Sequence, residues 1–316
     1  MVNVPGKLTT SQCAATKRKP FTVFACSVIG ASHIKNGKPC QDASFGEKGK
    51  KYRFAAVADG HGGEPYFRSD LGSRFAIEAL RSCVFDPSAA NALTKLSAYA
   101  DNIKTVKERE KIILQIKKSI VNRWNMLVAA DIEANPFTDE ELDSLPAKYA
   151  NEYRNGEHVE SVYGSTLISV LWTDNFLLAL QVGDGMCVML NNEAEFLQPV
   201  PVDENCFLNV TTSLCDKNVI DSFRHYYSKT APAAVLIGTD GIDDCFAGAE
   251  KLYDFYRVVL SSFNEKDEET AKTELKDYFP RLSEKGSGDD ISIGIIINNE
   301  ILRTLKIEKP ETEDGE

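Results

Sequence analysis

No apolar run in the sequence reaches the roughly 20 residues that a membrane-spanning helix needs, and the N-terminus has no apolar signal-peptide centre. We therefore expect no membrane association and a cytoplasmic location. Basic residues are in the minority, with 36 Lys and Arg against 47 Asp and Glu, and the net charge is −11. Because nucleic-acid binding depends on Lys and Arg that neutralise phosphates, this charge argues against a nucleic-acid partner.

The cysteine and histidine patterns of disulfide-rich and zinc-binding proteins are also missing from the sequence. Its eight cysteines are scattered without a Cys-x-x-Cys pair, which argues against a disulfide framework or a zinc knuckle. Its four histidines, His33, His61, His158 and His225, are too dispersed to suggest a histidine-rich zinc site.

The composition is that of a globular protein with a substantial core, at 43% hydrophobic and 26% charged residues. No obvious repeat or low-complexity linker divides the 316 residues, which suit one large two-layer β architecture with covering helices. We expect a polar N-terminal lead at 1–20, a single domain at 21–300 and an acidic C-terminal tail at 301–316.

Hydrophobic periodicity predicts the main elements of this domain. Strands are expected at 21–29, 52–58, 166–172, 176–182, 233–237 and 291–297. Helices are expected from 64 onward, at 102–133, at 244–263 and at 268–282. The segment 135–159 is expected as a surface excursion with one short helix, and 199–230 as an irregular loop. The hydrophobicity of the hairpin at 166–182 predicts that both of its faces are covered, which is the layering of an α-β-β-α sandwich.

The most informative motif is Asp-Gly-His-Gly-Gly at 59–63, which directly follows the apolar run at 54–58. A carboxylate and glycines at a strand end place oxygen ligands where the backbone can approach an ion or a phosphate closely, with an imidazole beside them. Taken alone, the motif is equally compatible with an ordinary turn, because Asp and Gly both favour turns.

Three other predicted strands carry acids at one end. Asp184 and Asp240 each follow an apolar strand, whereas the pair Asp289 and Asp290 precedes the last one. If the last strand runs antiparallel to the others, all four strand ends share one acidic cleft. Clustered carboxylates repel one another and are costly to desolvate, so divalent cations are the simplest explanation for their grouping. Mg²⁺ and Mn²⁺ suit such hard oxygen ligands.

In their order along the chain, these segments resemble the motifs of the metal-dependent type-2C protein serine/threonine phosphatases, the PPM family. The matching segments are residues 30–42, 59–63, 164–166, 182–184, 239–244 and 289–292. Details at 33, at 38–42 and at 209–212 are more similar to a bacterial branch. The resemblance implies an α+β fold, a four-layer α-β-β-α sandwich with two central, mainly antiparallel sheets, and a type-2C phosphatase-like domain at 21–300.

The resemblance also implies hydrolysis of phosphoserine and phosphothreonine in proteins by a metal-activated water. Two Mn²⁺ or Mg²⁺ ions are implied: Asp59 bridges both, the Gly60 carbonyl joins one, and Asp240 and Asp289 complete the other. Asp42 is implied to act nearby through water. Phosphorylated proteins are the implied substrates, and a serine/threonine kinase is the implied opposing partner in signalling.

Two more acids resemble positions that hold a third, weaker ion in the family. They are Asp184 and Asp244, and for each of them a role in a local turn is the alternative. His61 is the candidate general acid for the departing alkoxide, since the ordinary pKa of His, about 6.5, allows proton transfer near neutrality. Its alternative is a surface histidine that caps a turn.

One position departs from the family pattern. Gly37 stands where relatives of the eukaryotic type carry a phosphate-binding Arg, so we expect Lys38 or His33 to hold the phosphate, with Lys35 as a further candidate. None of these side chains has the planar fork with which guanidinium holds two oxygens. Gln41 stands where some relatives have Glu.

Other catalytic chemistries are disfavoured by the sequence. No cysteine has an Arg six positions later, so the phosphate loop of cysteine-dependent phosphatases is missing. The Gly-Ser-Thr segment at 164–166 has no visible His and Asp partners and is interpreted as a strand start rather than a nucleophile. Two alternatives to the phosphatase remain: a catalytically weak phosphatase-like binding module, and a metallohydrolase of a small phosphorylated metabolite.

Overall fold

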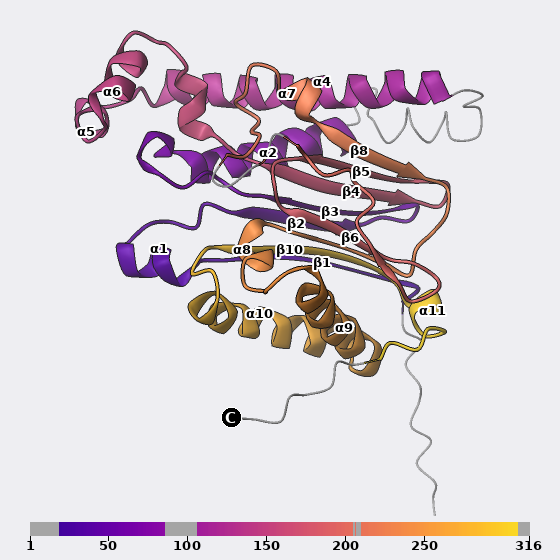
Figure 1. Cartoon of the computed structure of the whole chain (residues 1–316). Helices are drawn as coiled ribbons and strands as arrows, with labels where there is room; N and C mark the ends of the chain where they lie inside the picture. Colours follow the sequence, from indigo (N-terminus) through magenta and orange to yellow (C-terminus); the bar gives the residue numbers. More distant parts are fainter. Residues whose placement is uncertain (1–18, 86–105, 205, 207–209, 309–316) are drawn as a thin grey trace, which may run out of the picture.

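The computed structural model describes residues 19–85, 106–204, 206 and 210–308. Two five-stranded antiparallel sheets face each other, and helices cover the outer face of each sheet (Figure 1). The expected four-layer α-β-β-α sandwich is therefore confirmed. Most of the expected N-terminal lead, the end of the expected tail and the first residues of the helix expected at 102–133 lie outside the described residues.

The first sheet joins the two ends of the domain. Its strands, in spatial order, are β1 (Phe21–Val28), β10 (Ile291–Asn298), β9 (Ala234–Gly238), β6 (Met186–Leu190) and β7 (Phe196–Leu197). β1 pairs with β10 along its whole length, from Phe21 opposite Asn298 to Val28 opposite Ile291. All but one residue of β10 are buried, because a neighbouring strand lies on each side and a layer on each face.

The second sheet contains the predicted hairpin. Its strands, in spatial order, are β2 (Ala43–Lys48), β3 (Tyr52–Ala58), β4 (Leu167–Thr173), β5 (Leu177–Val182) and β8 (Arg224–Ser228). In the turn of the hairpin, Thr173 Oγ1 accepts hydrogen bonds from the backbone N–H groups of Asn175 and Phe176. Neither β2 nor β8 was predicted, because these edge strands are only half-buried and carry polar residues.

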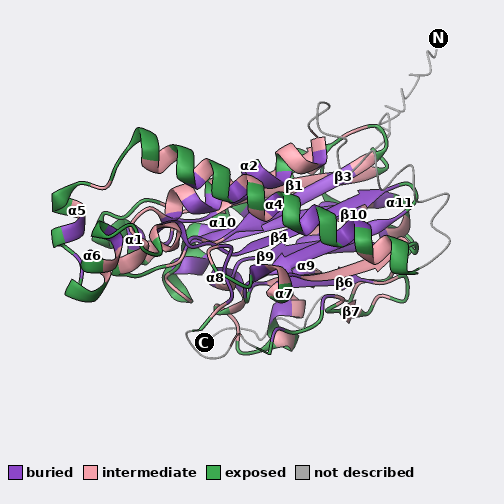
Figure 2. Cartoon of the chain, turned by 90° about the horizontal axis from the view of Figure 1, so that it is seen from above, coloured by how far each residue is buried: buried purple, intermediate pink, exposed green. Residues whose placement is uncertain are grey.

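The outer layers are two pairs of long helices. α2 (Ser69–Phe85) and α4 (Val106–Ala134) cover the second sheet, whereas α9 (Ala249–Glu265) and α10 (Glu268–Lys285) cover the first. On α4, Ile113, Ile116, Ile120 and Trp124 are buried at helical spacing, as expected. Figure 2 shows buried residues concentrated in the strands and exposed residues on the outer helix faces.

Short helices complete the chain. They are α1 (Ala31–Asn36), η1 (Glu64–Tyr66), α5 (Asp139–Asp143), α6 (Ala147–Arg154), η2 (Val159–Tyr163), α7 (Val219–Ser222), α8 (Asp240–Asp243) and α11 (Asn299–Leu302). The segment 135–159 is less superficial than predicted, because it forms two helices whose Leu142, Ala150 and Tyr153 belong to the core over the second sheet. Within the described part of the chain, none of the helices is both long and apolar enough to cross a bilayer.

Candidate metal centre

The acidic strand ends meet at one end of the sandwich. β10 runs antiparallel to β9, with Ile293 opposite Gly238, so the start of β10 lies beside the end of β9, as predicted. At the end of β3, Asp59 N donates to Thr166 Oγ1 at 3.0 Å, and Thr166 N donates to Asp59 O at 2.8 Å. These two bonds fix the first acidic strand end against the start of β4.

A cavity of about 450 Å³ lies between these strand ends. Its lining residues are His33, Gln41, Asp59, Gly60, His61, Gly62, Tyr66, Asp184, Val210, Thr211, Asp240, Asp244 and Asp289. Among the candidate site residues from the sequence, Asp42, Lys38 and Lys35 are outside this lining. Sequence reasoning had not singled out Tyr66 for the site, since it belongs to no acidic motif, whereas Val210 and Thr211 belong to the segment 209–212 that the resemblance included.

Asp59 and Asp240 lie on the wall of this cavity, and each affects the other's ionisation. Burial, and then the charges of Asp42, Asp240 and Asp289, raise the pKa of Asp59 well above its ordinary value. Burial and the charges of Asp184 and Asp289 raise the pKa of Asp240 to about 6. Carboxylates that favour protonation so strongly are under mutual repulsion, which a bound cation would relieve.

Asp42 lies behind the cavity rather than on its wall. It is buried, and its Oδ2 accepts a hydrogen bond from Thr239 Oγ1 at 2.9 Å. Burial, and then the charge of Asp290, raise the pKa of Asp42 to about 8. In this position Asp42 supports the strand end that presents Asp240.

Asp290 joins the first acidic motif to β10. Its Oδ1 accepts from Gly30 N and its Oδ2 accepts from Gln41 N, both at 2.6 Å. Because successive side chains of an extended segment point in opposite directions, only one of the paired acids can face the cavity. Asp289 faces it, and Asp290 holds the backbone that leads to Gln41 and Asp42. The presence of two adjacent acids, Asp289 and Asp290, was the sequence signal for the structural role of Asp290.

His33 contacts both of these acids from α1. Its Nδ1 lies 2.9 Å from Asp290 Oδ2, outside the angle of a hydrogen bond, and its Nε2 lies 3.8 Å from Asp289 Oδ1. Lys38 and Lys35 are exposed. Gly37 ends α1 in the left-handed conformation, with φ of 65°, so Arg would be strained at this position.

His61 is packed between Tyr66 and Gly164. Its ring lies edge-on to Tyr66 with centroids 5.1 Å apart, and its backbone N–H donates to Gly164 O at 3.0 Å. A Cβ atom on Gly164 would lie 2.5 Å from His61 Cδ2, so glycine is needed there for the imidazole to fit. Ser165 is fully buried and its Oγ donates to Thr166 O, which agrees with a structural role rather than a nucleophilic one.

Asp243 is a further, half-buried acid beside Asp240 and Asp244. Burial, and then the charge of Asp240, raise its pKa to about 8. Its Oδ1 has no hydrogen-bond partner among the described residues. The only sequence signal for it was its place within the motif at 239–244.

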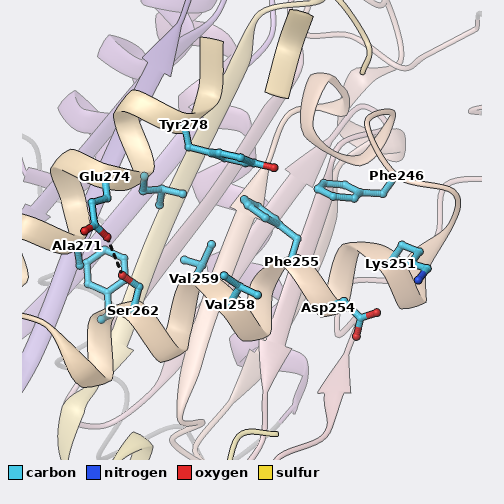
Figure 3. A pocket seen from close by; sticks show the side chains of 12 residues that line it. Phe246, Lys251, Asp254, Phe255, Val258, Val259, Ser262, Ala271, Glu274 and Tyr278 are labelled. Carbon is cyan, nitrogen blue, oxygen red and sulfur yellow. Dashed lines mark hydrogen bonds between the residues drawn. The ribbon is translucent and has the colours of Figure 1, made fainter. Parts of the chain in front are cut away.

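A larger cavity lies elsewhere, in a groove of about 510 Å³ between α9 and α10 (Figure 3). Phe246, Phe255, Val258 and Tyr278 are among its mainly apolar lining. Glu274, on the same wall, is already bonded to Ser262 and Lys266. Because the groove offers few convergent polar groups, the acidic cavity is the candidate site.

The family model of protein phosphatase 2C matches residues 29–279. Among curated proteins, the sequence has no significant match.

Solved structures share the fold at low identity. The catalytic domain of the serine/threonine phosphatase PstP, in complex with two manganese ions, has a TM-score of 0.53 and 16% identity, over 88% of this chain and 97% of that one. PppA of Pseudomonas aeruginosa has a TM-score of 0.53 and 16% identity, over 88% and 98%. The S. agalactiae serine/threonine phosphatase has a TM-score of 0.54 and 12% identity, over 88% and 99%.

Proposed function

The chain belongs to the protein phosphatase 2C family, and on that premise we propose which of its residues carry out the reaction. Members of this family are metal-dependent serine/threonine protein phosphatases, so the protein is an enzyme that acts on phosphorylated proteins. The observation that supports our assignment is the convergence of four strand ends on one cavity, where Asp59, Asp240, Asp289 and His61 are neighbours.

The oxygen ligands of the cavity suit two Mn²⁺ or Mg²⁺ ions. Asp59 would bridge them, the Gly60 carbonyl would join one, and Asp240 and Asp289 would complete the other. The donors are hard oxygens, and the raised pKa values of Asp59 and Asp240 indicate carboxylates without compensating positive charge. When bound, two such metal ions would lower the pKa of a water molecule and neutralise the charge of the phosphate.

The other acids support this pair. Asp184 and Asp244 line the same cavity and would hold a third, weaker ion. Asp42 is separated from the cavity. It would support the metal ligands through its hydrogen bond with Thr239, and through a water molecule. These assignments divide the acids into those that face the cavity and those that hold its walls.

His61 would donate a proton to the departing serine or threonine alkoxide. Burial lowers the pKa of His61, and the charges of Asp184 and Asp216 partly oppose that effect. A lowered pKa makes the imidazolium a stronger acid, although a smaller fraction is protonated at neutral pH. The packing against Tyr66 and the backbone bond to Gly164 hold the ring at the cavity wall.

His33 is the stronger candidate for the group that holds the phosphate. It lines the cavity beside Asp289, whereas Lys38 lies on the exposed turn after α1. A single imidazole N–H gives one directed contact, which the metal ions would have to supplement. Lys38 is the alternative.

We also propose the wider setting of the enzyme. Its phosphatase domain spans 21–300, with a polar lead before it and an acidic tail after it. Its phosphoprotein substrates require a serine/threonine kinase that opposes it in signalling. Because such a kinase consumes ATP, we place both enzymes in the cytoplasm.

The experiment is the release of phosphate from phosphoserine, phosphothreonine and phosphotyrosine peptides, and from small phosphorylated metabolites, with Mn²⁺, Mg²⁺, Zn²⁺ or chelator. We expect turnover of the first two peptides with Mn²⁺ or Mg²⁺ and none with chelator. Full activity without metal would contradict the metal assignment. Binding of phosphopeptides without turnover would favour a catalytically weak module, and preference for metabolites would favour a small-molecule hydrolase.

A further inference from the structure

A second cavity, of about 300 Å³, adjoins the metal centre. Tyr66 lines both cavities, so its ring forms a wall that they share. A polypeptide whose phosphoresidue enters the acidic cavity can therefore extend over this second cavity. Since an extended chain advances about 3.3 Å per residue, a side chain within roughly three positions of the phosphoresidue can reach it.

Tyrosines form the body of the second cavity. Tyr66 comes from η1, and Tyr149 and Tyr153 come from α6. The Tyr153 hydroxyl lies 2.9 Å from Ser161 Oγ and donates to Pro65 O at 3.3 Å. These bonds tie α6 to both η1 and η2, so the aromatic walls are held by the fold.

The charge at this cavity is predominantly negative. Glu152, Glu160 and Asp216 line it, against the cation Lys217 and the titratable His158. Asp216 Oδ2 accepts from Ser213 N at 2.8 Å. Within the described part of the chain, neither Glu152 nor Glu160 has an ion-pair partner, so both carboxylates are available to a ligand.

We propose that this cavity is a subsite for an arginine or lysine side chain of the substrate protein, within three residues of the phosphoserine or phosphothreonine. An aromatic wall attracts a cation through its ring face, and the two glutamates supply the opposite charge. The long aliphatic stem of a basic side chain also fits a cavity built from tyrosine rings. This inference rests on the proposed function, because it names the sequence context that the same active site selects.

The test uses the full chain with Mn²⁺ and a set of phosphothreonine peptides with alanine flanks. Arg is placed singly at each of the three positions before and after the phosphoresidue. We expect one or more positions to raise kcat/KM about tenfold over the all-alanine peptide, as a cation–π contact with a partly exposed ion pair allows. The measured quantity is the ratio of the two kcat/KM values, which cancels any loss of turnover common to both peptides.

Two variants and a matched control separate the subsite from general charge effects. The double variant E152Q/E160Q should lower the ratio to about twofold or less. E152K/E160K should prefer a peptide with Glu at the same position. E157Q is the matched control, because it removes an exposed carboxylate from the same segment without touching the cavity, and it should keep the wild-type ratio.

Three results would overturn the subsite: no preference for Arg at any of the six positions, a preference that survives in E152Q/E160Q, or an equal loss in E157Q. Failure of the proposed function has a different signature. In that case the wild-type enzyme with Mn²⁺ would release no phosphate from any peptide or from p-nitrophenyl phosphate, and the subsite would fail with it.

Discussion

The Thr239 hydroxyl donates a hydrogen bond to Asp42 Oδ2 at 2.9 Å and thereby joins the first acidic motif to the end of β9. Thr239 Oγ1 also accepts a hydrogen bond from Ser292 N at 3.1 Å. One side chain therefore holds two strand ends and a buried carboxylate together, directly before Asp240. Asp42 therefore lies behind the cavity and supports the strand end that presents Asp240.

Thr239→Val should weaken both folding and metal binding. The substitution keeps the shape but leaves the buried Asp42 carboxyl group and Ser292 N without this hydrogen-bond partner, which costs about 1–3 kcal/mol. We expect the free energy of unfolding to fall by about 2 kcal/mol and the affinity for Mn²⁺ to fall in calorimetry. Thr239→Ser keeps the hydroxyl and is the control. Equal metal affinity in the Thr239→Val variant and the wild-type protein would show that Asp42 needs no support from this residue.

Asp59→Asn and Asp240→Asn should each abolish most turnover while the protein stays folded. An amide preserves the shape of the ligand without the charge that holds the ions. Because metal-ion catalysis contributes several kcal/mol, we expect kcat/KM to fall by roughly a hundredfold or more. Asp277→Asn, on the exposed face of α10, is the matched control. Unchanged metal binding in both site variants would show that the assigned ligands are wrong.

The stability of the chelated protein should fall as pH rises. The pKa of Asp240 is raised to about 6 and that of Asp42 to about 8, whereas both are about 3.9 when unfolded. Between the unfolded pKa and the folded pKa of each acid, the folded state binds more protons than the unfolded state. The contribution of these two acids to stability is therefore largest at low pH and is lost as pH rises through their folded pKa values.

Thermal unfolding in chelator between about pH 5 and pH 8 checks this sign. We expect Tm to decrease over that range, and the increase in Tm on adding Mn²⁺ to be larger at the upper end. Asp240→Asn should flatten the slope in chelator, which separates the effect of this site from repulsion across the whole acidic protein. A Tm that rises with pH over this range in chelated wild-type protein would refute the assignment of the raised pKa values.

His61→Gln should slow the hydrolysis of alkyl phosphates more than that of aryl phosphates. A serine or threonine alkoxide needs a proton as it leaves, whereas p-nitrophenolate is already stable. General acid catalysis contributes roughly 100-fold or more, so we expect a loss of that order for the phosphopeptide and a smaller one for p-nitrophenyl phosphate. Comparison of kcat on the two substrates is the measurement, and equal losses would remove the general-acid role.

His33→Ala should reduce kcat/KM on a phosphopeptide by roughly ten- to a hundredfold, because a charge-assisted hydrogen bond is worth about 1.5–3 kcal/mol. Lys38→Ala, on the exposed turn that follows α1, should change it less than about twofold. Mn²⁺ affinity is measured in parallel, since His33 also contacts Asp290. If neither variant changes kcat/KM beyond about twofold, the metals or another residue hold the phosphate.

Five interior strands of the two sheets could be predicted from the sequence because they are covered on both faces, whereas the short interior strand β6 was missed. β3, β4, β5, β9 and β10 are almost wholly apolar, and such runs are visible without tertiary context. β2 and β8 were missed because an edge strand is satisfied by one neighbour and tolerates polar residues. The acidic ends of β3, β5, β9 and β10 were equally visible, since glycine and aspartate interrupt each apolar run.

The amino-acid sequence was sufficient to establish the fold class, the acidic motifs and the oxygen-ligand chemistry of the cavity. Which acid of a motif faces the cavity, and which supports it, became known from the packing of distant segments. Asp289 and Asp290 are adjacent in sequence, yet one lines the cavity and the other accepts two backbone hydrogen bonds. The same packing distinguished His33 from Lys38 and brought α6 beside the metal centre through Tyr66. Composition and periodicity report local burial, whereas the direction of a side chain and the partner it meets depend on how segments far apart in the chain come together.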